Sequence, residues 1–117
     1  MQKIKVSLIG YGYWGPKLAR NFSNSTNFNL VSIIDTSNKN LNKAKKDFPS
    51  VKTSRNYKDI LKIKNISLVI IATPTKTHFK IAKFSLINKK HVLVEKPLST
   101  IPGEVIKLEN LAKSNKK

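Results

Sequence analysis

A chain of 117 residues fits a single domain and is long enough to bury a core. Its apolar fraction of 39% excludes wholesale disorder, and no apolar run approaches the roughly eighteen residues of a membrane span. The absence of cysteine excludes disulfides and thiolate metal sites, and His78 and His91 share no ligand spacing, so no metal site is predicted.

The formal net charge of +17 raises nucleic acid as a partner. The lysines are scattered over nearly every predicted helix, however, and no RNA-binding motif is present. We expect no specific nucleic-acid partner, and only weak electrostatic binding at low salt. Residues 1–3 lead straight into a strand without a signal-peptide pattern, so a cytoplasmic location without membrane contact is expected.

The first predicted element is an apolar strand at residues 4–9, followed by the glycine-rich loop 10–15 and a helix over 14–24. The loop reads Gly10-Tyr11-Gly12-Tyr13-Trp14-Gly15, which matches G-x-G-x-x-G in its strand–turn–helix context. Gly10 allows the tight turn, Gly12 lets a diphosphate approach the backbone, and Gly15 lets the helix pack closely. The pattern predicts a diphosphate at the helix N-terminus.

A second strand at residues 30–34 ends in Asp35, twenty residues after Gly15. An acid at this distance can hydrogen-bond both ribose hydroxyls of an adenosine, and its charge favours NAD over NADP. The alternative is a helix N-cap at Asp35, and the two roles can coexist. Lys39 and Lys43 lie near enough in sequence to compensate a 2′-phosphate in part.

The rest of the chain continues to alternate helix and strand. Helices are predicted at 39–48, 56–62 and 78–88 and from about residue 100, strands at 51–53, 68–72 and 91–94, and a frayed tail from about residue 113. The strand at 68–72 is apolar on both faces, which is typical of a central parallel strand.

This alternation predicts an α/β fold, a doubly wound parallel sheet with strand order 3-2-1-4-5 in one domain over residues 1–117. Ligands of such folds bind where the strand order reverses, outside the carboxyl ends of the strands. Residues 10–15, 35, 73–75 and 95–97 are therefore expected to converge.

Three segments of the chain carry a resemblance to a known family. They are G-Y-G-Y-W-G-P at 10–16, A-T-P-T-K-T-H at 72–78 and E-K-P-L at 95–98. Together, in this order, they resemble the glucose–fructose oxidoreductase/inositol dehydrogenase/MocA (Gfo/Idh/MocA) family of oxidoreductases. The form of the first segment is most similar to members that oxidise nucleotide-linked sugars.

The resemblance implies an NAD(P)-dependent oxidoreductase that moves hydride between nicotinamide and a hydroxyl of a sugar or nucleotide sugar. By matching position, Lys96 is the active-site lysine, Thr73 and Pro74 line the cofactor, and Glu95 contacts its ribose or holds Lys96. His78 matches the histidine of the second segment, and together with Tyr13 and Trp14 of the glycine loop it is expected among the cofactor-binding residues.

Each of these residues also has a plainer interpretation. By composition alone Lys96 is a solvated lysine and Glu95 an ion-pair partner. His78 buttresses or caps a helix start, which we favour over a reactive role. Tyr13 and Trp14 are packing aromatics at the entrance of the first helix.

Family members are much longer, and their second domain, which supplies most of the substrate pocket, has no counterpart in these residues. The sequence thus favours the cofactor-binding half of a sugar dehydrogenase, truncated or completed by a partner chain. Homo-oligomers and hetero-oligomers are both compatible with this prediction. A stand-alone dinucleotide-binding module without turnover is one alternative, and a basic nucleic-acid-binding protein is another.

Overall fold

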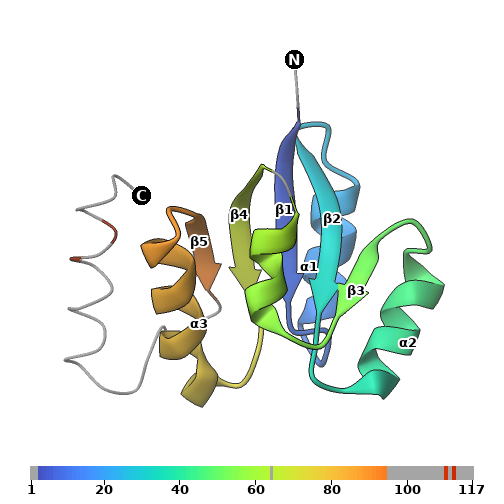
Figure 1. Cartoon of the computed structure of the whole chain (residues 1–117). Coiled ribbons are helices and arrows are strands. Elements are labelled where there is room, and N and C mark those ends of the chain that lie inside the picture. Colours follow the sequence, from blue (N-terminus) through green and yellow to red (C-terminus); the bar gives the residue numbers. More distant parts are fainter. Residues whose placement is uncertain (1–2, 64, 95–109, 111, 113–117) are drawn as a thin grey trace.

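The computed structural model describes residues 3–63, 65–94, 110 and 112, and it shows a parallel sheet with helices on both faces (Figure 1). Its elements are β1 (Ile4–Ile9), α1 (Gly15–Ser23), β2 (Phe28–Ile34), α2 (Asn38–Asp47), β3 (Lys52–Ser54), the 3₁₀ helix η1 (Tyr57–Lys62), β4 (Ile66–Ile71), α3 (Thr75–Ile87) and β5 (His91–Val94).

The sheet has the order β3-β2-β1-β4-β5, and each neighbouring pair is parallel. The chain therefore winds outward from β1 to one edge, returns, and winds outward again from β4 to the other. This arrangement confirms the predicted doubly wound α/β fold and its strand order. The order reverses between β1 and β4, which is where such sheets bind ligands.

Successive residues of the strands point to opposite faces of the sheet and so build two separate cores. In β4, Val69 and Ile71 face the core beneath α3 and η1, which also holds Ile81 of α3. Ile70 faces the other core, which lies beneath α1 and α2 and holds Ala19 and Ala44. Because both faces of β4 are covered, its near-continuous apolar run correctly indicated a central strand.

Most predicted boundaries hold within one or two residues, and α3 is the main exception. The helix begins at Thr75, three residues before the predicted start. Pro74 is extended, with φ −56° and ψ 144°, and its carbonyl accepts from the N–H of Thr77 at 2.9 Å. Proline thus starts this helix, a position where its missing N–H costs little.

The predicted last helix, the tip at residues 95–97 and the frayed tail fall on residues that the structure does not describe, apart from 110 and 112. Ala112 packs against the core beneath α3. Among the described residues, every helix is too short or too polar to cross a membrane.

Candidate functional site

The carboxyl ends of four strands are held level with one another by backbone hydrogen bonds. The N–H of Gly10 donates to Ile34 at 2.7 Å, and that of Asp35 donates to Ser54 at 3.0 Å. On the other side, the N–H of Ala72 donates to Ile9 at 2.8 Å. The residues that follow β1, β2, β3 and β4 therefore meet along one edge of the sheet.

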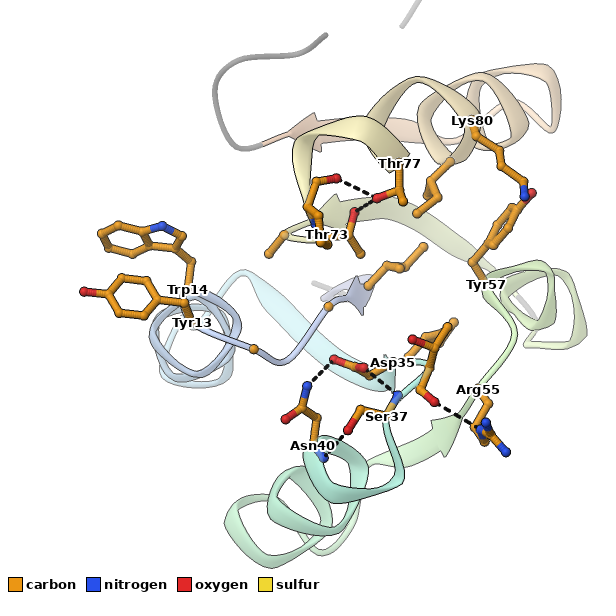
Figure 2. Close-up of a pocket in the computed structure, with 18 residues that line it drawn as sticks. Tyr13, Trp14, Asp35, Ser37, Asn40, Arg55, Tyr57, Thr73, Thr77 and Lys80 are labelled. Atoms are coloured by element: carbon orange, nitrogen blue, oxygen red, sulfur yellow. Dashed lines mark hydrogen bonds between the residues drawn. The ribbon is translucent and has the colours of Figure 1, made fainter. Parts of the chain in front are cut away.

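A cleft of about 680 Å³ lies along this edge (Figure 2). Its volume falls within the range usual for small-molecule and cofactor sites. The residues that line it come from all four strand ends, from the loop before α1, and from α2, η1 and α3: Ile9, Gly10, Gly12, Tyr13, Trp14, Ile34, Asp35, Thr36, Ser37, Asn40, Arg55, Tyr57, Ala72, Thr73, Pro74, Thr77, Lys80 and Ile81.

Two glycines of the loop are required by the fold itself. Gly10 has φ +105°, and a Cβ there would lie 2.6 Å from the carbonyl oxygen of Ala72. A Cβ at Gly15 would overlap the carbonyl oxygen of Gly10. The start of α1 thus sits directly against the turn, which is the close packing expected for Gly15.

Gly12 is in a different environment, because a Cβ there would have no atom within 4 Å. It lines the open cleft, and neither Gly12, Tyr13 nor Trp14 donates its backbone N–H to another described residue. These amides precede the first turn of α1, which carries no acidic side chain. Unpaired N–H groups at the positive end of a helix suit an anion such as a phosphate.

Asp35 directly follows β2 and lines the cleft, and its carboxylate accepts hydrogen bonds from three donors. Oδ2 accepts from the N–H of Tyr11 at 2.8 Å and from Nδ2 of Asn40 at 3.1 Å, and Oδ1 accepts from the N–H of Ser37 at 2.8 Å. Since a carboxylate has about four acceptor positions, roughly one remains for a ligand. This site offers less than the pair of ribose contacts expected from the sequence.

The alternative role of Asp35 as an N-cap is wrong. The N-cap of α2 is Ser37, whose Oγ accepts from the N–H of Asn40 at 3.3 Å. The bond from Asp35 to the N–H of Ser37 spans two residues and shapes the turn before the helix.

Tyr11 carries a structural role that the sequence reasoning missed. Its side chain is 1% exposed, packs with the core beneath α1 and α2, and donates its hydroxyl to Oδ2 of Asp47 at 2.6 Å. Burial, followed by this hydrogen bond and the charge of Asp47, raises the pKa of Tyr11 well above its ordinary value. The run of apolar and aromatic residues from β1 into the loop was the available signal.

Tyr13 and Trp14 both line the cleft, and at the entrance of α1 they pack against each other and not into the core. Tyr13 is 80% exposed and Trp14 47% exposed. Their rings meet edge to face at 4.8 Å, and Nζ of Lys17 lies 5.0 Å from the indole centroid. Figure 2 shows both rings at the rim of the cleft, on the side away from Asp35.

The opposite wall of the cleft comes from the start of α3. Thr73 and Pro74 line it, which leaves their contact with the cofactor a prediction, and the hydroxyl of Thr77 lies 2.7 Å from both the Thr73 Oγ1 and the Pro74 carbonyl. His78 lies behind this wall, 1% exposed, with Nε2 2.7 Å from the carbonyl of Thr73. It buttresses the turn, as favoured above, and does not line the cleft.

Two basic residues of the cleft, Arg55 and Lys80, were not anticipated from the sequence. Arg55 follows β3 and donates from Nε to the carbonyl of Thr36 at 3.2 Å, while Lys80 of α3 places Nζ 5.9 Å from the ring of Tyr57. A charged residue after the third strand was the available signal for Arg55. Lys43, considered as a cation near the ribose, instead lies beside Asp47 at 3.7 Å.

Glu95 and Lys96 lie outside the described residues, so their predicted positions at the tip of β5 stay predictions. Within the part of the chain that the structure describes, no three histidine or acidic side chains gather as metal ligands would.

A doubly wound sheet with an open glycine loop facing an acid at the end of β2 defines a dinucleotide-binding Rossmann domain. Residues 4–117 match the model of the Gfo/Idh/MocA oxidoreductases, described as an oxidoreductase family with an NAD-binding Rossmann fold. The chain belongs to this family, and it is an NAD(P)-binding domain.

Known proteins similar to this chain are longer. The oxidoreductase YdgJ of Escherichia coli, whose function is uncharacterised, is 36% identical over 95% of this chain, which covers 32% of YdgJ. A biliverdin reductase from Synechocystis, solved with biliverdin and NADP⁺, has 31% identity and a TM-score of 0.91, with 97% of this chain and 36% of the enzyme aligned. The myo-inositol 2-dehydrogenase of Lactobacillus plantarum has 28% identity and a TM-score of 0.88, with 97% and 34% aligned. The chain spans about a third of their length.

Proposed function

We propose that this domain binds NAD and presents its nicotinamide for hydride transfer to or from a hydroxyl-bearing carbon of a sugar or nucleotide sugar. The observation that carries the proposal is the cleft itself, which Gly12 and Asp35 both line and in which the backbone N–H of Gly12 has no partner among the described residues. A hydroxyl of the adenosine ribose would donate a hydrogen bond to the Asp35 carboxylate, and the diphosphate would lie over Gly12.

The chemistry requires residues beyond the cleft. Bound NAD supplies the hydride acceptor. By the family motif, the Lys96 ammonium would orient the reacting hydroxyl and stabilise negative charge that develops on its oxygen, and Glu95 would contact a ribose of the cofactor or hold Lys96. The substrate class rests on the form of the glycine loop and on the similarity to a cyclitol dehydrogenase. A further substrate-binding region, on the same or a partner chain, would hold the substrate against the nicotinamide.

Cofactor binding is tested by titrating the 117-residue chain with NAD⁺ while following the fluorescence of Trp14, its single tryptophan, which lines the cleft. Calorimetry supplies an independent affinity. We expect saturable binding that Asp35→Ala weakens about tenfold or more, because the ribose loses a charge-assisted hydrogen bond.

The matched control is Asp47→Asn, which also removes a carboxylate charge but at the end of α2, away from the cleft. Thermal melts establish the folded fraction of each variant, since Asp35 also accepts three hydrogen bonds within the protein. A folded wild-type chain without saturable NAD⁺ binding would overturn the proposal.

Hydride transfer is tested separately, by NADH formation with a panel of sugars and nucleotide sugars. Lys96→Met is expected to abolish turnover and to leave NAD⁺ affinity nearly unchanged. NAD⁺ binding with no turnover on any substrate, even with the substrate-binding region supplied, would favour the stand-alone binding module.

A further inference from the structure

The ribose end of the cleft holds an arginine as well as an acid. Arg55 directly follows Ser54, whose carbonyl accepts from the N–H of Asp35 at 3.0 Å. The two residues thus leave neighbouring parallel strands at the same level of the sheet, and both line the cleft (Figure 2).

The guanidinium of Arg55 is held beside the residue that follows Asp35. Its Nε donates to the carbonyl of Thr36 at 3.2 Å, which leaves the N–H groups of both Nη atoms for another acceptor. Within the described part of the chain, no carboxylate forms an ion pair with Arg55. A guanidinium with free Nη groups matches the geometry of a phosphate and can bind it through two hydrogen bonds.

Asp35, whose charge would repel the 2′-phosphate of NADP, accepts hydrogen bonds from three donors of the protein. The N–H groups of Tyr11 and Ser37 and Nδ2 of Asn40 all point at the Asp35 carboxylate. The dipoles of these three donors oppose part of the field that the carboxylate projects into the cleft. Discrimination against NADP by charge repulsion is therefore weaker here than at a bare carboxylate.

A ribose hydrogen-bonded to Asp35 brings its 2′-oxygen within reach of the neighbouring side chains of the cleft wall. A phosphate on that oxygen carries close to two negative charges, so a nearby free guanidinium attracts it strongly. Asp35, after β2, thus favours NAD, and Arg55, after the neighbouring β3, favours NADP.

We infer that Arg55 binds the 2′-phosphate of NADP(H), so that this domain accepts NADP as well as NAD and discriminates little between them. The inference rests on the proposed function, because it places the adenosine ribose at Asp35. It adds a specificity-determining residue directly after β3, at a position to which no role was assigned from the sequence.

The test compares the dissociation constants of NAD⁺ and NADP⁺ for the whole chain at one fixed ionic strength. For the wild type, we expect the two values to lie within about tenfold of each other. Arg55→Gln should weaken NADP⁺ binding about tenfold or more and change NAD⁺ binding less than about twofold, since the loss of the bond to Thr36 affects both cofactors and only NADP⁺ also loses charge-assisted hydrogen bonds to a 2′-phosphate. Arg55→Lys should restore part of the loss, because it keeps the charge without the planar geometry.

The matched control is Arg20→Gln, which removes the same charge from an exposed position on α1 that does not line the cleft. It should leave the ratio of the two dissociation constants unchanged. If Arg55→Gln leaves that ratio unchanged, or if Arg20→Gln shifts it as much, the inference fails while the proposed function stands. If the folded wild type binds neither cofactor saturably, both fail.

Discussion

The glycine-rich loop divides into two halves that serve different ends. Its inner half, Gly10, Tyr11 and Gly15, is packed into the protein, where a Cβ would overlap backbone or where the side chain is buried. Its outer half, Gly12 and the two aromatics after it, faces the cleft or solvent. Within six residues, the same residue types are therefore needed for folding at some positions and are free for a ligand at others.

The largest expected effect comes from Gly10→Ala. The substitution places a Cβ 2.6 Å from the Ala72 carbonyl at a φ of +105°, so backbone must shift. We expect a loss of at least about 3 kcal/mol in the free energy of unfolding, measured by urea denaturation. The control, Gly12→Ala, should cost less than about 1 kcal/mol. Equal losses in the free energy of unfolding for Gly10→Ala and Gly12→Ala would contradict the division of the loop into a packed and an open part.

The next largest effect is expected from Gly12→Val, and it concerns binding. The added side chain enters open space, so the free energy of unfolding should change by less than about 1 kcal/mol. It would, however, occupy the approach of the diphosphate to the loop amides. NAD⁺ affinity should fall about a hundredfold or more, by calorimetric titration. Retained affinity in the folded variant would count directly against the diphosphate site.

Tyr11→Phe tests the inner half through a single hydroxyl. It removes the hydrogen bond to Asp47, and we expect a loss of about 1 to 2 kcal/mol in the free energy of unfolding. Tyr13→Phe removes a hydroxyl from an exposed ring two residues away and serves as the control. If both variants unfold at the same urea concentration as the wild type, the partly buried hydrogen bond contributes nothing to the free energy of unfolding.

The contact between Tyr11 and Asp47 also predicts that the free energy of unfolding depends on pH. Because folding raises the pKa of Tyr11, the folded chain keeps the phenol proton at a pH where the unfolded chain loses it. The stability contributed by this group is thus fully present below about pH 10, the ordinary tyrosine value, and declines as the pH rises above it. The difference in unfolding free energy between wild type and Tyr11→Phe should shrink above about pH 10. Both chains carry the same lysines, so taking this difference removes the effect of lysine deprotonation. A constant difference would contradict the assigned shift.

The smallest expected effect is that of Tyr13→Ser. Because the ring is 80% exposed, the free energy of unfolding should change by less than about 0.5 kcal/mol in a urea titration. A larger loss would mean that Tyr13 also stabilises the fold, and the predicted difference between substitutions at Tyr11 and Tyr13 would not hold.

Local patterns were enough to predict most of the fold. The apolar run of β4 indicated a central strand, and alternating strands and helices indicated the order β3-β2-β1-β4-β5. The start of α3 was misplaced because helical periodicity begins after Thr77, whereas proline sets the boundary at Thr75. Helix and strand periodicities are local properties of the chain, but a helix start depends on which N–H groups find acceptors.

For the site, the chain alone determined the glycine loop and the acid at the end of β2, because turn geometry and spacing along one βαβ unit specify both. Tertiary structure alone decided that Tyr11 is buried and Tyr13 exposed, that three donors occupy Asp35, and that Arg55 stands beside it. The physical reason is that these outcomes depend on groups brought together by strand pairing and helix packing. Arg55 lies twenty residues beyond Asp35, and only the parallel pairing of β2 with β3 brings both to the same cleft.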